Sequence, residues 1–224
     1  MPTTIRKAKA ADAAECGRII HAAFAAIAAQ HNFPPDFPSA EVATGISSML
    51  IAHPDFYAIV AENDGRILGS NFLDERSPIG GIGPITIDPS VQNKGVGRQL
   101  MQAVMERAAT KNMLGIRLVQ DSFHNRSLCL YARLGFTTRE PLSVLQGPAL
   151  KVQLAGYDVR PATEADLAAC NAVSAVCMAS IAAPNLKMPS HKRALGWSNI
   201  LNVSPAMPPT SATLPTQLPR TTKA

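Results

Sequence analysis

Apolar residues recur along the chain with two different periods. Four segments have the helical period of three to four residues, which places their apolar side chains on one face. The helices predicted from them cover 13–29, 41–52, 95–111 and 126–134. Asp12 and Glu15 have the spacing of a capping box, which predicts the start of the first helix. The prolines of 32–38 predict its end, because proline cannot continue a helix.

Shorter apolar runs, bounded by turn residues, predict strands. They cover 5–6, 56–62, 66–74, 82–87, 116–120 and a segment that begins at Phe136. Asn63-Asp64-Gly65 separates the second run from the third and predicts a tight hairpin. Helices that alternate with strands around one early hairpin are typical of an α/β or α+β domain. We therefore predict one such domain over residues 3–150.

The segment after this domain resembles its beginning. From Val159-Arg160 to Cys170 the chain repeats the pattern of Ile5-Arg6 to Cys16 at a constant offset. We interpret 157–173 as the remnant of the start of a second, repeated domain. A frameshift, a truncation and a genuine tail all remain open as its origin. From residue 174 the periodicity is lost and proline becomes frequent, so a low-complexity and mostly disordered tail is predicted over 174–224.

The distribution of charge argues against a nucleic-acid ligand. Lys and Arg number 21 and Asp and Glu number 16, but the whole surplus lies beyond Asp166, so the predicted domain is neutral. The chain has neither an apolar core of signal-peptide length at its start nor an apolar run long enough to cross a membrane. Its four cysteines lack metal-site spacing. We expect a cytoplasmic protein that binds no nucleic acid, membrane or metal.

A glycine-rich loop lies between the predicted strand at 82–87 and the helix at 95–111. Its sequence is Gln92-Asn93-Lys94-Gly95-Val96-Gly97-Arg98. Free backbone N–H groups and the helix dipole at such a position favour a phosphate. A Walker loop would continue with Lys-Ser/Thr after the second glycine, and a dinucleotide fingerprint would need a third glycine after a first strand. Neither pattern is present, so the loop predicts a different phosphorylated ligand.

A second sequence block narrows the choice of ligand. Asn125 is followed by Leu130-Tyr131 and then by Gly135-Phe136. Together with the Gln-x-x-Gly-x-Gly loop, which follows a strand ending in Asp-Pro, this block resembles the GNAT (GCN5-related) N-acetyltransferase superfamily. The resemblance covers 3–150 and implies a mixed central sheet flanked by helices, with acetyl-CoA as co-substrate. It also makes 157–173 resemble the start of a tandem copy.

The resemblance implies which residues bind acetyl-CoA. Backbone N–H groups of the glycine-rich loop would hold the pyrophosphate, the strand before it would hold the pantetheine arm, and Asn125 would bind the arm nearby. Tyr131 would lie near the thioester sulfur. The implied binding residues are Ile85, Thr86, Ile87, Gln92, Asn93, Lys94, Gly95, Val96, Gly97, Arg98, Asn125 and Tyr131.

The reaction also predicts catalytic groups. An amine that attacks the thioester produces a departing thiolate, and the phenol of Tyr131 can protonate it. The oxyanion is expected at a strand amide near Ile85–Ile87. Glu75 is predicted as the base that deprotonates the amine, with His124 and a chain of water molecules as alternatives. Cys129 is interpreted as a packed residue, because the sequence supplies no obvious histidine to activate it.

The expected function is transfer of the acetyl group of acetyl-CoA to a primary amine of a small molecule or peptide. The sequence leaves the amine open, although the aromatic and proline-rich segment 31–38 could form one wall of its site. Two alternatives stay open: a non-catalytic acyl-CoA-binding sensor, and a damaged gene product that folds poorly. A homodimer also stays open.

Overall fold

The computed structural model describes residues 3–139, 141–143, 155–173 and 194–195. Its strands are β1 (Thr4–Lys7), β2 (Phe56–Asn63), β3 (Arg66–Asp74), β4 (Ile79–Ile82), β5 (Thr86–Ile87), β6 (Gly115–Arg117), β7 (Phe136–Thr137) and β8 (Ala194–Leu195). Its α-helices are α1 (Ala13–Gln30), α2 (Ala40–Ala52), α3 (Val96–Thr110) and α4 (Asn125–Arg133). Short 3₁₀ helices are η1 (Ala10–Asp12), η2 (Pro89–Val91) and η3 (Glu164–Asp166).

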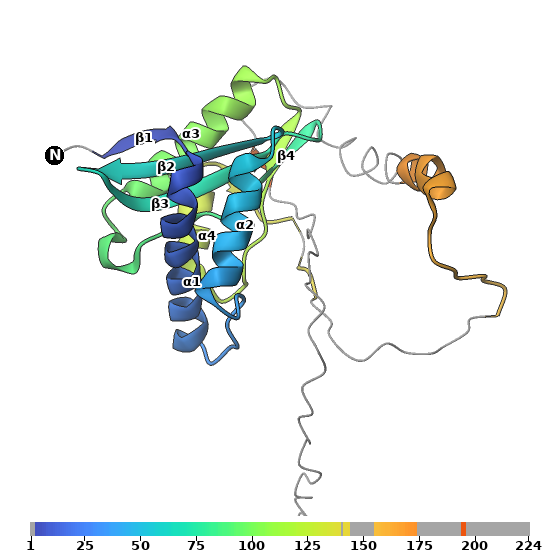
Figure 1. Cartoon of the computed structure of the whole chain (residues 1–224), viewed down its shortest axis with the longest axis horizontal. Helices are drawn as coiled ribbons and strands as arrows, with labels where there is room; N and C mark the ends of the chain where they lie inside the picture. Colours follow the sequence, from blue (N-terminus) through green and yellow to red (C-terminus); the bar gives the residue numbers. More distant parts are fainter. Residues whose placement is uncertain (1–2, 140, 144–154, 174–193, 196–224) are drawn as a thin grey trace, which may run out of the picture.

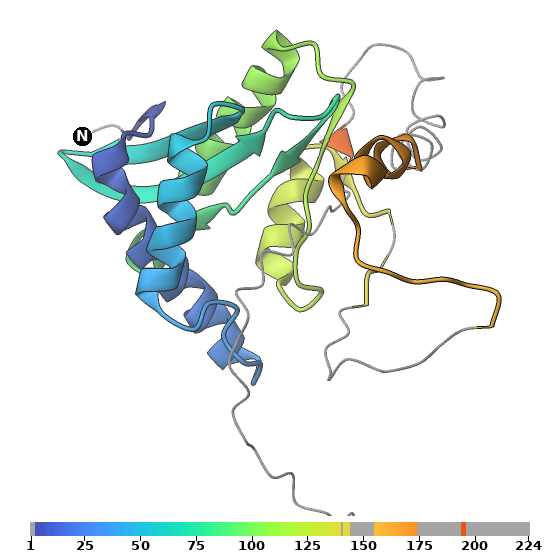
Figure 2. The ribbon, with the colours of Figure 1, turned by 45° about the vertical axis from the view of Figure 1, so that its right-hand side comes forward.

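The main sheet is mixed, as the family resemblance implies. Its strand order is β1-β2-β3-β4-β6, and β5 pairs with β3 beside this path. The pairs formed by β1, β2, β3, β4 and β5 are antiparallel, whereas β4 and β6 are parallel. Helices α1 and α2 cover one face and α3 covers the other (Figures 1 and 2). The predicted α/β fold class is therefore confirmed.

Strand β2 shows how the alternating pattern builds two apolar layers. Ala58 and Val60 pack with the residues of α1 and α2, whereas Ile59 and Ala61 pack with those of α3. All four side chains are buried, because both faces of the sheet carry helices. The hairpin between β2 and β3 is also confirmed, and both of its turn residues have positive φ (Asp64 50°, Gly65 78°).

The run predicted as one strand over 82–87 is divided in the structure. Pairing with β3 shifts between Leu73↔Ile82 and Ser70↔Thr86, so one extra residue is accommodated on the side of β4 and β5. Pro84 lies within the break and has no N–H to donate to a neighbouring strand. The strand predicted over 116–120 is shorter in the structure. It ends at Arg117, because its partner strand β4 ends at Ile82 and provides no further backbone groups for pairing.

The predicted capping box at Asp12 and Glu15 is wrong, although α1 does begin at Ala13. The Asp12 carboxylate accepts hydrogen bonds from the backbone N–H of Lys9 (2.7 Å) and from the guanidinium of Arg6 (2.7 and 3.0 Å). It therefore closes the turn η1 and ties it to β1. Glu15 instead pairs with Arg18 (2.7 Å).

The segment predicted as a repeat has the local contacts of the first one. Asp166 accepts bonds from Arg160 (2.6 and 2.7 Å) and from the backbone N–H of Thr163 (2.8 Å), as Asp12 does from Arg6 and Lys9. A helix follows η3 from residue 167 and is described as far as 173. The tail predicted over 174–224 lies outside the described residues, except that β8 pairs in parallel with β7. The domain boundaries stay a prediction.

Candidate active site

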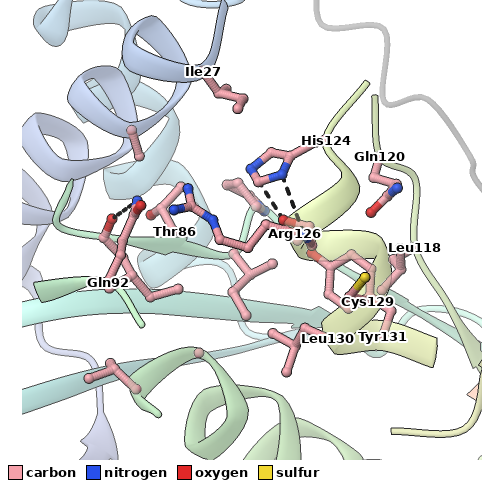
Figure 3. A pocket seen from close by; sticks show the side chains of 18 of the residues that line it. Ile27, Thr86, Gln92, Leu118, Gln120, His124, Arg126, Cys129, Leu130 and Tyr131 are labelled. Carbon is pink, nitrogen blue, oxygen red and sulfur yellow. Dashed lines mark hydrogen bonds between the residues drawn. The ribbon is translucent and has the colours of Figure 1, made fainter. Parts of the chain in front are cut away.

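One cleft brings together most of the residues that the sequence singles out. It has a volume of about 770 Å³ and opens where β5 and β6 diverge beyond the break at Pro84 (Figure 3). Its walls come from the C-terminal half of α1, the segment 82–87, the loop before α3, the segment 118–121 and one face of α4. Among the residues predicted to bind the ligand, those that line it are Ile85, Thr86, Ile87, Gln92, Asn93, Gly95, Val96, Gly97, Arg98 and Tyr131.

The N-terminus of α3 lies at one end of this cleft. Gly95 caps the helix with φ 85°, a left-handed conformation that a residue with a Cβ rarely adopts. The first N–H groups of a helix have no partner within it, so those that follow Gly95 can bind phosphate oxygens. Gln92 holds the loop in place, because its side-chain amide donates to the carbonyl of Ile87 (3.1 Å). Arg98 adds a positive charge to the same lining.

Close packing around Gly97 explains why the second conspicuous position of the loop is a glycine. A Cβ at this position would lie 3.1 Å from Cδ1 of Ile87 and 3.4 Å from Cδ2 of Leu130. Both of these side chains line the cleft. A larger residue at Gly97 would therefore push against β5 and α4 at the point where they face each other.

The buried carboxylate of Asp88 holds the loop before α3 against β3 and α1. Only 6% of the residue is exposed, and its carboxylate accepts bonds from the N–H and hydroxyl of Ser90 (2.9 and 2.8 Å). It also accepts bonds from Arg66 of β3 (2.9 Å) and Arg18 of α1 (3.2 Å). Burial alone would raise the pKa of Asp88, but the bonds from Ser90, Arg66 and Arg18 together lower it. The charged carboxylate thus joins the sheet, α1 and the loop.

Two buried oxygen atoms in the cleft lack a hydrogen-bond partner among the described residues. They are the hydroxyl oxygen of Thr86 and the side-chain carbonyl oxygen of Gln120. Thr86 lies on β5 and is 4% exposed, and Gln120 lies on the opposite wall beside Leu118 (Figure 3). Buried polar atoms are rarely left unpaired, so the Gln120 oxygen can accept a bond, and the Thr86 hydroxyl can accept or donate one, when a polar ligand enters. The lining thus fits a long ligand with phosphate, amide and apolar parts.

Tyr131 lies on the buried side of α4 and is 7% exposed. Burial is the largest influence on the pKa of its phenol and raises it to about 12. The phenol therefore stays protonated at neutral pH and can act as a proton donor. Cys129 lines the same cleft and is exposed, so its interpretation as a packed residue is wrong, and the described contacts include no histidine bond that would activate it.

The structure corrects the assignment of Glu75 as a base. Its carboxylate is paired with Arg107 (2.6 Å) and Lys111 (3.4 Å), and it lies outside the cleft in a separate, smaller pocket. The bond from Arg107 lowers the pKa of Glu75, which opposes proton uptake. Strand β3 ends at Asp74, and Glu75, the next residue, pairs with Arg107 of α3.

Asn125 and Lys94 are also not brought into the cleft. Both side chains are exposed, and neither belongs to the lining. His124, the residue before Asn125, does line the cleft and caps α4 with its ring. The register of this helix therefore places the preceding residue where the sequence analysis expected Asn125.

Sequence reasoning missed several lining residues. Arg126 extends from the first turn of α4 toward the side of Thr86 and Gln92 (Figure 3). Ile27 of α1 was recognised only as part of an apolar helix face, yet it faces the cleft. Arg126 follows Asn125 directly in the sequence, and its positive charge could have indicated a contact with a phosphate or carboxylate group.

Aromatic rings connect the segment 31–38 to the loop before α4. Phe33 stacks on Phe123 with ring centroids 4.5 Å apart, and His31 lies 4.9 Å from the same ring. Phe123 directly precedes the lining residue His124. The loop between α1 and α2 therefore contacts the loop that leads into α4, at the end of the cleft away from α3.

Among the described residues, the apolar helices are each too short or too polar to cross a lipid bilayer.

The Asp88 anchor predicts a pH-dependent stability. Because folding lowers the pKa of Asp88, its contribution is complete above the ordinary aspartate pKa of about 3.9 and is lost as the pH falls below it. Asp88→Asn should lower the free energy of unfolding by about 1 to 2 kcal/mol at pH 7, a modest value because both arginines are half exposed. Urea unfolding at pH 7 and pH 3.5 measures it, and the difference from wild type should shrink at the lower pH.

Asp64→Asn is the control for this experiment, because Asp64 lies in a turn where asparagine also accepts positive φ. An Asp88→Asn protein as stable as the Asp64→Asn protein at pH 7 would contradict the anchoring role.

Comparisons with known proteins agree with this geometry. Residues 54–138, which include β2 to β7, match the acetyltransferase (GNAT) domain. Mycothiol acetyltransferase of Thermomonospora curvata is 33% identical over 79 residues. That match covers 35% of this chain and only 27% of the relative, so the chain corresponds to about a quarter of it.

Solved structures share the fold. The PaiA N-acetyltransferase of Thermoplasma acidophilum, solved in complex with coenzyme A, has a TM-score of 0.54 at 16% identity and covers 63% of this chain and 93% of its own. A transcriptional regulator from Bacillus halodurans C-125 has a TM-score of 0.53 at 20% identity and covers 65% of this chain and 100% of its own. Residues 54–138 thus match a GNAT acetyltransferase domain, and the solved structures share the fold of the chain.

Proposed function

We propose that the protein is an acetyl-CoA-dependent N-acetyltransferase that acts on a primary amine. The observation that carries the proposal is that the N-terminus of α3, the strand β5 and the Tyr131 side chain open onto one cleft. An anion site, an exposed strand and a protonated phenol are three groups that thioester aminolysis can use together. The related structure from Thermoplasma acidophilum, which contains coenzyme A, supports the choice of ligand.

The proposed binding mode follows the polarity of the cleft. The loop amides that follow Gly95, with Arg98, would hold the pyrophosphate. The segment 85–87 would offer backbone groups and the unpaired hydroxyl of Thr86 to the pantetheine amides. Arg126 supplies a further positive charge to the lining. This arrangement would place the acetyl end between the break at Pro84 and α4.

The proposed reaction is direct attack. The amine nitrogen forms a C–N bond with the thioester carbonyl carbon, and a backbone N–H of the segment 85–87 would stabilise the oxyanion. The C–S bond then breaks, and Tyr131 donates its phenolic proton to the leaving thiolate. The nitrogen loses a proton, so acetylated amine and free thiol are the products.

The acceptor would enter from the end of the cleft that α1 and the loop before α4 form. His124 of the lining would take the amine proton, with a chain of water molecules as the alternative, because Glu75 is paired with Arg107 outside the cleft. The lining contributed by α1 is mostly apolar, including Phe24 and Ile27, and favours an amine with an apolar body.

The phosphate-binding assignment predicts an effect of Gly97→Val on acetyl-CoA binding. A valine would press on Ile87 and Leu130 and displace the start of α3, so the Kd should rise at least about tenfold. Isothermal titration calorimetry with acetyl-CoA measures it. Gly45→Val is the matched control, since a Cβ at this exposed helical position of α2 meets no atom within 4 Å. Equal affinities of the two variants would refute the assignment.

The catalytic assignment predicts that Tyr131→Phe slows turnover without weakening acetyl-CoA binding. Loss of a proton donor should lower kcat about 100-fold, while the ring remains packed in place. Release of CoA thiol with a panel of primary amines measures turnover, and Tyr157→Phe, at a residue 75% exposed, is the control. An unchanged kcat would remove Tyr131 from the mechanism. Tight acetyl-CoA binding by wild type with no thiol release for any amine would instead favour the non-catalytic sensor.

A further inference from the structure

One buried oxygen atom of the cleft has no partner in the proposed binding mode. It is the side-chain carbonyl oxygen of Gln120, which accepts no hydrogen bond from the described residues. Gln120 lines the cleft between the end of β6 at Arg117 and the start of α4 at Asn125. A buried acceptor that stays unpaired costs free energy, which a donor on a bound ligand would recover. This position therefore suits an N–H or O–H group of a ligand.

Gln120 lies at the end of the cleft where the reaction would take place. Figure 3 shows its side chain on the same side of the cleft as Tyr131, whereas Gln92, in the loop before α3, lies on the other side. In the proposed binding mode the pyrophosphate is at the start of α3 and the sulfur is beside Tyr131. The groups that reach Gln120 are therefore those beyond the sulfur, which are the acetyl group and the attacking amine.

Only one of these two groups can donate a hydrogen bond. An amide oxygen such as that of Gln120 accepts hydrogen bonds and carries no charge. The acetyl group consists of a methyl group and a carbonyl, neither of which has an N–H or O–H to donate. A primary amine with a free lone pair, the form that attacks the thioester, has two N–H groups. The oxygen of Gln120 therefore matches the amine.

We propose that Gln120 binds the acceptor: its buried oxygen accepts one N–H of the attacking amine and so directs the nitrogen lone pair at the thioester carbonyl carbon. This contact rests on the proposed N-acetyltransferase function. When the C–N bond forms, the nitrogen becomes positively charged, and a hydrogen bond from a charged donor is shorter and stronger. The bond to Gln120 thus stabilises the transition state more than it stabilises the bound amine, which raises kcat.

The protons balance without a transfer to Gln120. The nitrogen lone pair forms the C–N bond, the electron pair of the C–S bond goes to sulfur, and the thiolate takes the phenolic proton of Tyr131. One of the two nitrogen protons passes to His124 or to water. The other proton stays on the amide product and keeps its bond to Gln120.

The contact selects primary amines over secondary amines. A secondary amine has a single N–H, which it must release to form the product, so the oxygen of Gln120 is left unpaired again. The apolar side chains that α1 contributes to the lining, among them Phe24 and Ile27, suit a hydrocarbon group on the amine. The acceptor class is therefore a primary amine on an apolar group, for which benzylamine is a simple probe.

Two bisubstrate analogues test the contact by binding alone. Each joins the CoA sulfur, through an acetyl linker, to the nitrogen of benzylamine. This nitrogen keeps its hydrogen in one analogue and carries a methyl group in the other. By isothermal titration calorimetry, wild-type protein should bind the N–H analogue with a Kd about tenfold lower than that of the N-methyl analogue. Gln120→Met has a side chain of similar length without the acceptor and should lose this preference.

Two further variants serve as controls. Gln102→Met makes the same exchange at an exposed position of α3 outside the cleft lining, and it should keep the wild-type preference. Gln120→Glu retains an acceptor oxygen and should keep the preference as well. Both Gln120 variants should bind acetyl-CoA with the wild-type Kd, because acetyl-CoA carries no acceptor amine. A Gln120→Met protein that still prefers the N–H analogue, or a Gln120→Glu protein that does not, would overturn the proposal.

The same measurements separate this contact from the function on which it rests. A wild-type protein that binds neither acetyl-CoA nor the analogues contradicts the acetyltransferase function. A wild-type protein that binds acetyl-CoA but does not prefer the N–H analogue contradicts the acceptor role of Gln120 alone. Weaker acetyl-CoA binding by Gln120→Met would contradict that role too, because it would assign Gln120 to the cofactor.

Discussion

The sheet cannot continue unchanged beyond Ile82, because Pro84 has no N–H for a neighbouring strand and the pairing with β3 must absorb one extra residue. Strand β4 pairs with β6 up to this point, and β5 pairs with β3 after it. The two strands that would otherwise be neighbours therefore diverge. Apolar side chains, strand backbone and the face of α4 meet around the opening, which makes it a cleft within the sheet. Every other feature of the site depends on this divergence.

Electrostatic interactions fix the loop that closes one end of the cleft. A helix N-terminus has a fixed partial positive charge, and Arg98 reinforces it. Such a loop would be poorly ordered if nothing held it against the sheet. The buried carboxylate of Asp88 does so by binding Ser90 within the loop and two arginines outside it. The start of α3 and the carboxylate that anchors the loop before it are thus of opposite charge.

The sequence was sufficient to predict the elements and to identify the glycine-rich loop before α3, most of whose residues line the cleft. Helical periodicity predicted both ends of each of α1 to α4 to within one residue. The turn at Asp64-Gly65 depends only on local backbone preferences. Glycine positions in the loop before α3 could be interpreted without knowing the fold, because Gly95 satisfies a local φ requirement. These features depend on neighbouring residues, which a sequence displays directly.

Features that depend on distant residues could not be predicted in this way. Glu75 was a reasonable base until Arg107, which lies 32 residues further along, was found to pair with it. Whether His124 or Asn125 lines the cleft depends on where α4 begins. The capping box at Asp12 failed because Arg6 on β1 competes for the same carboxylate. In each case a tertiary ion pair or a helix register outweighed the local pattern.

We propose that one ligand spans the cleft from the N-terminus of α3 to Tyr131. A crystal structure of the protein with bound acetyl-CoA tests it most directly. We expect the pyrophosphate against the N–H groups that follow Gly95, and the thioester sulfur within hydrogen-bond reach of the Tyr131 hydroxyl. Acetyl-CoA bound with its pyrophosphate away from α3, or with its sulfur out of reach of Tyr131, would contradict it.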